Sequence, residues 1–316
     1  MIDKTLAIHC RGLIKDYGSV RAVDGLDLQV HVGECFGLLG PNGAGKTTTL
    51  RSLVGLVRPT SGQALIDGRR YQDLRQPRRV VGAVLESGGS RPGRSGRDHL
   101  RILSTSGGVG NDRVDEVLEM VGLTDAAGRR VSGYSLGMRQ RLGLAGALLG
   151  DPEVLILDEP ANGLDPEGIA WLRSLLQGLA AEGRSVLISS HLLSEVAQTV
   201  DRVVIVDHGK LRFAGSLDEL GGGTVSVRAV AMDQLRNALL ARGYGVKAAA
   251  GALLVSGATA EDVGGVAAAE RIVLSGLTSD GASLEAAFLG LTSSDEAPPA
   301  ARARRLLTRP TTRIAN

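Results

Sequence analysis

The chain of 316 residues is 43% hydrophobic and 22% charged, and its formal net charge at pH 7 is +2. This length allows one sizeable domain and a smaller one, while the nearly balanced charge gives no reason to expect nucleic acid or a strongly acidic partner. The two cysteines provide neither a disulfide framework nor a paired zinc motif, and no apolar signal segment or run of 18 apolar residues occurs, so we expect a cytosolic protein that does not span a membrane by itself.

The first informative segment is the glycine-rich loop at residues 40–48, GPNGAGKTT. It follows a short apolar run at residues 35–39, typical of a buried parallel strand, and precedes apolar residues at helical spacing. The pattern G-x-x-x-x-G-K-[ST] surrounds a triphosphate with backbone N–H groups, aims Lys46 at the β/γ-phosphates and leaves the Thr47 hydroxyl for Mg²⁺. We therefore predict nucleotide binding by Gly40, Pro41, Asn42, Gly43, Ala44, Gly45, Lys46, Thr47 and Thr48.

Up to about residue 220, short β-rich apolar runs alternate with helical stretches, which predicts a parallel α/β sheet. The β-rich runs disappear between about residues 87 and 150, so we expect a helical insertion there. Three later runs, VLIL, VLIS and VVIV, each lead into a polar pair at the end where open α/β sheets bind ligands. These pairs are candidates for one site: Asp158-Glu159, Ser190-His191 and Asp207-His208.

Asp158 and Glu159 are adjacent at a strand end, so their side chains can diverge. Because a protein that catalyses phosphoryl transfer mainly positions reactants and stabilises charge, we assign Asp158 to the Mg²⁺ shell and Glu159 to orienting or deprotonating the attacking water. An exposed acidic strand end is the alternative. His191 is placed to hydrogen-bond a γ-phosphate or the attacking water, although a purely structural histidine would look the same in isolation.

The pattern changes after a glycine linker at residues 221–223. The following elements are predicted to be a strand at 224–230, a helix at 232–242, strands at 246–250 and 253–255, a helix at 259–270 and a strand at 271–274. This β-α-β-β-α-β order is that of ferredoxin-like domains. One more amphipathic helix is expected at 283–291. Beyond it, Ser, Pro, Ala and Arg favour a disordered basic tail, either simply solvated or attracted to a membrane surface.

A second motif, YSLGMRQR at residues 134–141, precedes the acidic strand. The order of phosphate loop, this motif, VLILDEP, Gly163-Leu164-Asp165 and Ser190-His191 resembles the ATP-binding subunits of ABC transporters over about residues 4–220. In this resemblance residues 134–138 are the signature loop, LSGGQ in the family, whose Ser135 and Gly137 bind the γ-phosphate of ATP held by the opposite subunit. The resemblance also implies that Tyr17 stacks on adenine and that Asp165 belongs to the D-loop, which contacts the other subunit. An ordinary half-buried aromatic is the alternative for Tyr17.

The chain departs from the family pattern at two places. Leu136 and Met138 replace the first glycine and the glutamine of the signature, and Glu86 stands where the family usually has the glutamine of the Q-loop. A carboxylate near a triphosphate is electrostatically unfavourable unless it ligates Mg²⁺ or is protonated. We therefore expect Glu86 to contact the nucleotide or its metal and to weaken or retime ATP engagement. Both departures are similar to variants in the subfamily of bacitracin- and daunorubicin-type antibiotic exporters.

The resemblance implies an α/β P-loop NTPase core at residues 1–220, with a helical subdomain at about 87–150, an α+β domain at 224–291 and a disordered basic tail at 292–316. It implies an ATPase that binds ATP and Mg²⁺, forms a head-to-tail homodimer and powers a separate permease from the cytoplasmic face of the membrane. The expected cargo is a drug, an antibiotic or another hydrophobic compound. The specificity for the cargo is expected to depend mainly on the permease. Two alternatives are a soluble ABC ATPase of DNA repair or translation and a resistance protein whose C-terminal domain senses or sequesters a ligand. A packing or dimer-supporting appendage is the plainer interpretation of that domain.

Overall fold

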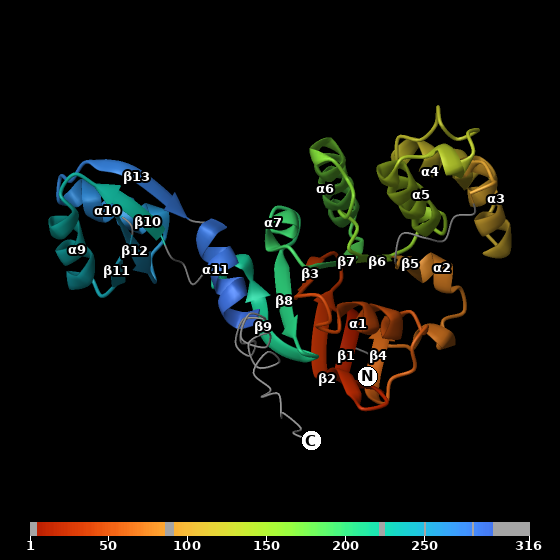
Figure 1. Cartoon of the computed structure of the whole chain (residues 1–316), viewed down its shortest axis with the longest axis horizontal. Coiled ribbons are helices and arrows are strands. Elements are labelled where there is room, and N and C mark those ends of the chain that lie inside the picture. The colour runs from red at the N-terminus through yellow and green to blue at the C-terminus, as the bar shows by residue number, and fades with distance from the viewer. Residues whose placement is uncertain (1–4, 86–91, 221–224, 250, 280, 293–316) are drawn as a thin grey trace, which may run out of the picture.

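The computed structural model describes residues 5–85, 92–220, 225–249, 251–279 and 281–292 (Figure 1). The strands of these residues form sheets of six, three and four strands. The expectations for Glu86, for the linker at 221–223 and for the tail beyond residue 292 concern residues outside this description.

The six-stranded sheet has the order β5-β6-β7-β3-β8-β9. Its neighbouring strands are parallel except for the terminal pair β8 and β9, so the predicted parallel α/β sheet is confirmed. Strands β3, β6 and β7 are buried along their whole length, because layers cover both faces. The strands are Cys35–Leu39 (β3), Val81–Val84 (β5), Val154–Asp158 (β6), Ser185–Ser190 (β7), Arg202–Asp207 (β8) and Lys210–Ser216 (β9).

Alternate residues of the central strands contribute to two separate hydrophobic clusters. On β6, Leu155 and Leu157 belong to one cluster, whereas Val154 and Ile156 belong to the other, as the period of two in a strand requires. Helices α6 (Pro166–Ala181) and α7 (Leu193–Val196) cover the first face, and α1 (Lys46–Leu53) with the three-stranded sheet covers the second (Figure 1). The six-stranded sheet thus lies between two layers, and the loops of the candidate site follow the carboxyl ends of its strands.

The three-stranded sheet is antiparallel, with the order β2-β1-β4, and the sequence analysis did not predict it. Its strands are Leu6–Tyr17 (β1), Val20–His31 (β2) and Ser61–Ile66 (β4). A signal was present, because Leu26, Leu28 and Val30 are buried and alternate with exposed polar residues. Polar residues and β-bulges interrupt the same alternation in β1, which weakens the pattern there.

Both cysteines are free and buried, Cys10 on β1 and Cys35 on β3. The predicted place of Cys35 in a core strand is therefore confirmed. Burial, with a smaller contribution from nearby carboxylates, raises the pKa of each thiol to about 12. A negligible fraction of either residue is thiolate at neutral pH, so both behave as small apolar core residues.

The segment between β5 and β6 is helical where it is described, as the sequence predicts. Its α-helices are α3 (Gly96–Ser106), α4 (Arg113–Met120) and α5 (Leu136–Leu148), and a 3₁₀ turn, η2, covers Val131–Gly133. Ser95 and Ser135 cap the first and last of these helices, each accepting a hydrogen bond from a backbone N–H of the first turn. Short elements before β5 are η1 (Tyr71–Asp73) and α2 (Pro77–Val80).

The C-terminal sheet has the order β11-β12-β10-β13, and every neighbouring pair is antiparallel. Its elements run β-α-β-β-α-β as predicted and pack around their own hydrophobic cluster. They are β10 (Val225–Ala229), α9 (Met232–Ala241), β11 (Gly245–Ala249), β12 (Ala252–Ser256), α10 (Ala260–Ala269) and β13 (Leu274–Ser279). The strand predicted at 271–274 was wrong in position, because Arg271 has φ +55° and the Ile272 N–H still donates to Ala267 at the end of α10.

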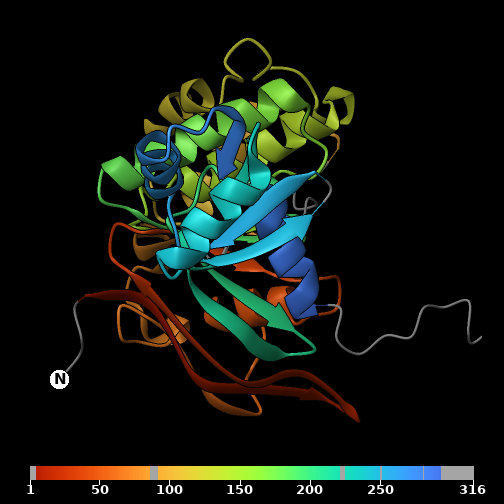
Figure 2. The same cartoon turned by 90° about the vertical axis from the view of Figure 1, so that its left-hand side faces the viewer.

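The last helix, α11 (Gly281–Thr292), leads back from the C-terminal sheet to the six-stranded sheet (Figure 1, Figure 2). It contacts α7, β8, β9 and the short helix α8 (Leu217–Leu220). Phe288 is 8% exposed and belongs to the same hydrophobic cluster as β6 and β7, with Leu284, Ala287 and Leu291 packed against it. The chain therefore leaves the core after residue 220 and contributes to it again, although 224–291 was expected to be one C-terminal domain.

Replacing Phe288 by Ala should lower the free energy of unfolding of the core by about 3 kcal/mol, because it removes a buried aromatic ring. Trp171 is the chain's one tryptophan and packs against the same cluster, so its fluorescence in a denaturant titration reports this unfolding. The matched control is Leu289→Ala, since Leu289 is 59% exposed on the same helix. An unchanged Trp171 transition in Phe288→Ala would mean that α11 does not belong to the core.

Candidate functional site

The glycine-rich loop connects β3 to α1 and turns sharply where the helix begins. Gly45 has φ +102°, and a Cβ there would collide with the carbonyl oxygen of Ala22, so only glycine fits. Gly45 is also the N-cap of α1, and no side chain caps the helix. The first N–H groups of α1 and the positive end of its dipole therefore remain available to an anion.

Lys46 lies within this loop, with only 6% of its surface exposed. Its Nζ donates to the carbonyl oxygen of Gly40 at 2.6 Å and to that of Pro41 at 3.3 Å. The same ammonium lies 3.2 Å from Oε1 of Glu159. The phosphate loop and the acidic strand end, which are far apart in the sequence, thus meet at Lys46.

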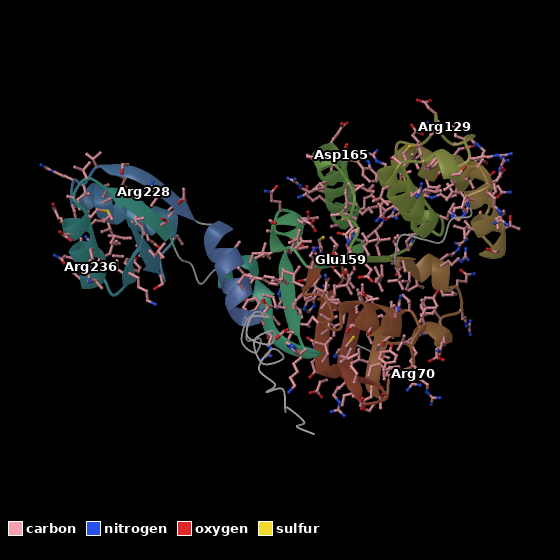
Figure 3. The ribbon with its side chains drawn as sticks, viewed as in Figure 1. Arg70, Arg129, Glu159, Asp165, Arg228 and Arg236 are labelled. Atoms are coloured by element: carbon pink, nitrogen blue, oxygen red, sulfur yellow. The ribbon has the colours of Figure 1, made fainter. Side chains whose placement is uncertain are left out.

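Glu159 comes directly after β6 (Figure 3), and its carboxylate contacts both Lys46 and His191. Its Oε1 faces Lys46, and its Oε2 lies 2.8 Å from Nδ1 of His191. The backbone of Glu159 has φ +49°, a conformation that is uncommon for a residue other than glycine. Its N–H donates to Oγ of Ser189 at 3.0 Å, which helps to hold this turn.

Asp158, the last residue of β6, points to a different partner from Glu159. It is 7% exposed, and its Oδ1 accepts a hydrogen bond of 2.5 Å from Oγ of Ser189. Asp158 and Ser189 are direct neighbours in the register of β6 and β7. Sequence reasoning missed Ser189, which bonds to both acidic residues; the pairing of the two strands was the signal that would have identified it.

The third polar pair forms a cluster of its own. Asp207 lies 2.9 Å from Nδ1 of His208 and 3.2 Å from a guanidinium nitrogen of Arg212 on β9. Of the three expected pairs, the structure therefore brings the first two together around Glu159. In the third pair, Asp207 contacts Arg212 instead.

The signature loop and the D-loop, here residues 163–165, lie at the N-termini of two helices. Ser135 caps α5 and Asp165 caps α6, each through its side chain. Together with Gly137 they line a cavity of about 450 Å³. In the described part of the chain, no hydrogen bond or ion pair links Ser135 or Gly137 to Lys46 or Glu159. The expected site residues thus divide into a group around the phosphate loop and a group at this second surface.

Tyr17, the last residue of β1, is 47% exposed, and Nζ of Lys15 lies 4.8 Å from the centroid of its ring. The cation covers part of the ring, and much of the remaining surface is open to a planar ligand. Glu86, the other residue expected at the nucleotide, lies outside the described residues.

Comparisons with known proteins identify relatives of the chain. The family model described as ABC transporter matches residues 23–162, and a domain of unknown function (DUF8746) matches residues 223–285. The bacitracin transport ATP-binding protein BcrA of Bacillus licheniformis is 48% identical over 65% of this chain and 68% of its own length. The lantibiotic transport ATP-binding protein SrtF of Streptococcus pyogenes is 38% identical over 65% of this chain and 88% of its own length.

Solved structures show the same fold. The ATP-binding subunit of an ABC transporter superposes with a TM-score of 0.62 at 28% identity, covering 68% of this chain and 92% of that one. A dimeric ATP-binding cassette in a post-hydrolysis state, bound to ADP and Pi, has a TM-score of 0.60 at 23% identity over 66% of this chain and 98% of that one.

Proposed function

Because the chain belongs to the ATP-binding subunits of ABC transporters, we propose that its ATP hydrolysis powers the export of an antibiotic through a separate membrane-spanning permease. The observation that carries the proposal is the position of Glu159 between Lys46 of the phosphate loop and His191. This arrangement places a carboxylate beside the lysine that would hold the β- and γ-phosphates, where an attacking water would need a base.

The loop residues fit a triphosphate. The uncapped N-terminus of α1 supplies N–H donors, and the ammonium of Lys46 already lies among oxygen atoms at the mouth of the loop. Glu159 would orient or deprotonate the water, while His191 would hold Glu159 in place through its Nδ1 contact and approach the γ-phosphate. Tyr17 would stack on the adenine.

Thr47 and Asp158 fit a magnesium ion, since hydroxyl and carboxylate oxygens are ligands that this hard cation accepts. Among the described residues no cluster of three or more His, Cys, Asp or Glu could hold a metal. In nucleotide sites Mg²⁺ is generally bound through one or two protein oxygens, substrate phosphates and water. When bound, Mg²⁺ would neutralise the charge that develops on the transferred phosphoryl group. We assign Glu86 to the same surroundings on the resemblance alone.

Ser135 and Gly137 would complete the nucleotide site of a second copy of the chain. They line a cavity whose lining includes neither Lys46 nor Glu159, which supports a head-to-tail dimer in which the partner's ATP binds at that cavity. In such a dimer Asp165 would contact the partner subunit.

A permease partner is proposed because ATP-binding subunits of this family pair with permeases. No helix in the described part of the chain is long and apolar enough to cross a bilayer. A groove of about 330 Å³ between β5 and α5 is suited to the partner's docking. Most residues that line this groove are apolar, and Arg78 and His99 also belong to its lining. Burial, and secondarily the charge of Arg94, lower the pKa of His99 below its usual value. Docking there would place the subunit on the cytoplasmic face of the membrane.

The cargo is proposed from the relatives, whose names give bacitracin and lantibiotic transport. The test expresses the chain in a sensitive strain, with and without a candidate membrane-spanning permease from the source genome, and measures membrane fractionation and resistance to bacitracin and to a lantibiotic. Membrane association should require the partner, and resistance should require both the partner and an intact Glu159. Resistance without the partner, or with Glu159→Gln, would instead show sequestration of the drug and refute the proposal.

A further inference from the structure

Leu136 packs directly over Gly163, so the start of α5 contacts the D-loop of the same protomer. Leu136 is the first residue of α5, and Gly163 lies in the D-loop with φ +77°. A Cβ built on Gly163 would lie 2.7 Å from Cγ of Leu136 and closer still to its Cδ2. Carbon atoms do not approach to this distance without displacement, so the leucine occupies space that only glycine leaves free.

Two further contacts join the same segments. Nε2 of Gln140, one turn further along α5, donates to the carbonyl oxygen of Asn162 at 3.3 Å. A Cβ on Gly137 would be 3.4 Å from Cδ2 of Leu164, an ordinary packing distance. Three successive loop residues, 162–164, thus face the first two turns of α5.

The loop also leads directly to Glu159. The N–H of Asn162 donates to the carbonyl oxygen of Glu159 at 3.2 Å, which closes a turn at the end of β6. A shift of residues 162–163 would therefore be transmitted to a backbone that already has a positive φ at Glu159.

We propose that Leu136 is a positioning residue, which fixes the D-loop and through it Glu159 against the signature helix α5. This inference rests on the proposed dimer: Ser135 acts on the ATP of the partner, whereas Glu159 acts on the ATP of its own protomer. The contact of Leu136 with Gly163 mechanically connects the two sites. Family members with LSGGQ have glycine at the position of Leu136, so the contact depends on a residue that distinguishes this chain.

The test is a double-mutant cycle on the full chain with Gly163→Ala, Leu136→Ala and the double variant, measuring kcat and KM for ATP. Gly163→Ala should lower kcat about tenfold, because Leu136 or the D-loop must move to make room for the methyl group. A small misplacement of a catalytic group such as Glu159 slows the reaction strongly. KM should change less than about twofold, since the phosphate loop is untouched. The double variant should recover most of the loss, because truncating Leu136 makes room for the new methyl group.

Gly183→Ala is the matched control, because Gly183 has φ +88° but no atom near a built Cβ. It reproduces the backbone strain without the collision and should retain kcat. The same double-mutant cycle, measured as changes in the free energy of unfolding, tests the contact between Leu136 and Gly163 without using activity. Inactivity of the parent chain would therefore refute the proposed function alone. The positioning role would be overturned if the parent chain is active and the loss of kcat in the double variant equals the product of the losses in Gly163→Ala and Leu136→Ala.

Discussion

Glu159→Gln should lower the rate of ATP hydrolysis about 10²- to 10⁴-fold and leave ATP binding intact. The amide keeps the shape of the side chain and the backbone bond to Ser189, but it can no longer accept a proton from the attacking water. Removal of the negative charge also removes its repulsion of the triphosphate. Dimers that retain ATP should therefore accumulate.

Single-turnover kinetics and size-exclusion chromatography with ATP measure both effects. Glu153→Gln is the matched control, because Glu153 is exposed just before the opposite end of β6 and should behave like the parent. Undiminished turnover in Glu159→Gln would refute the assignment of the base.

The second large effect is expected for Lys46→Ala, which should lose at least about a hundredfold in turnover and bind ATP weakly. The substitution removes a buried ammonium that lies 3.2 Å from Glu159, so the carboxylate and the incoming phosphates would repel one another uncompensated. Lys247→Ala is the control, since Lys247 is an exposed lysine on β11 of the C-terminal sheet. Titration with a fluorescent ATP analogue measures binding, and near-parental affinity would contradict the role of Lys46.

The sequence predicted the features whose signals are local. The phosphate loop is a contiguous pattern, β3 is a short apolar run directly before it, and β6, β7 and β8 are apolar runs that lead into polar pairs. The ferredoxin-like order also followed from short alternating segments. Even so, the start of the last strand was misplaced, since the chain at Arg271 still closes the preceding helix.

The features that escaped prediction depend on contacts between distant segments. Ser189 reaches Asp158 only because β6 and β7 pair in register, and Phe288 joins the core only because α11 folds back onto it. The contact of Leu136 with Gly163 likewise follows from the packing of α5 against the loop after β6. Within the sequence each of these residues is ordinary, and its role depends on its partner.

In the proposed dimer, each nucleotide site combines the phosphate loop of one protomer with the signature loop of the other. A second variant, Gly137→Asp, places a carboxylate where the γ-phosphate of the partner's ATP is proposed to lie. It should still fold, because a Cβ there is in ordinary contact and an anion is favourable in the first turn of a helix.

The most direct measurement mixes Lys46→Ala with Gly137→Asp in equal amounts and follows ATP turnover. Each variant alone should be close to background. About half of the mixed dimers would combine the two variants, and each of these would contain one intact site, so turnover should recover to about a quarter of the parental rate. A mixture that stays at background would contradict the shared site and show that each protomer hydrolyses ATP with its own residues alone.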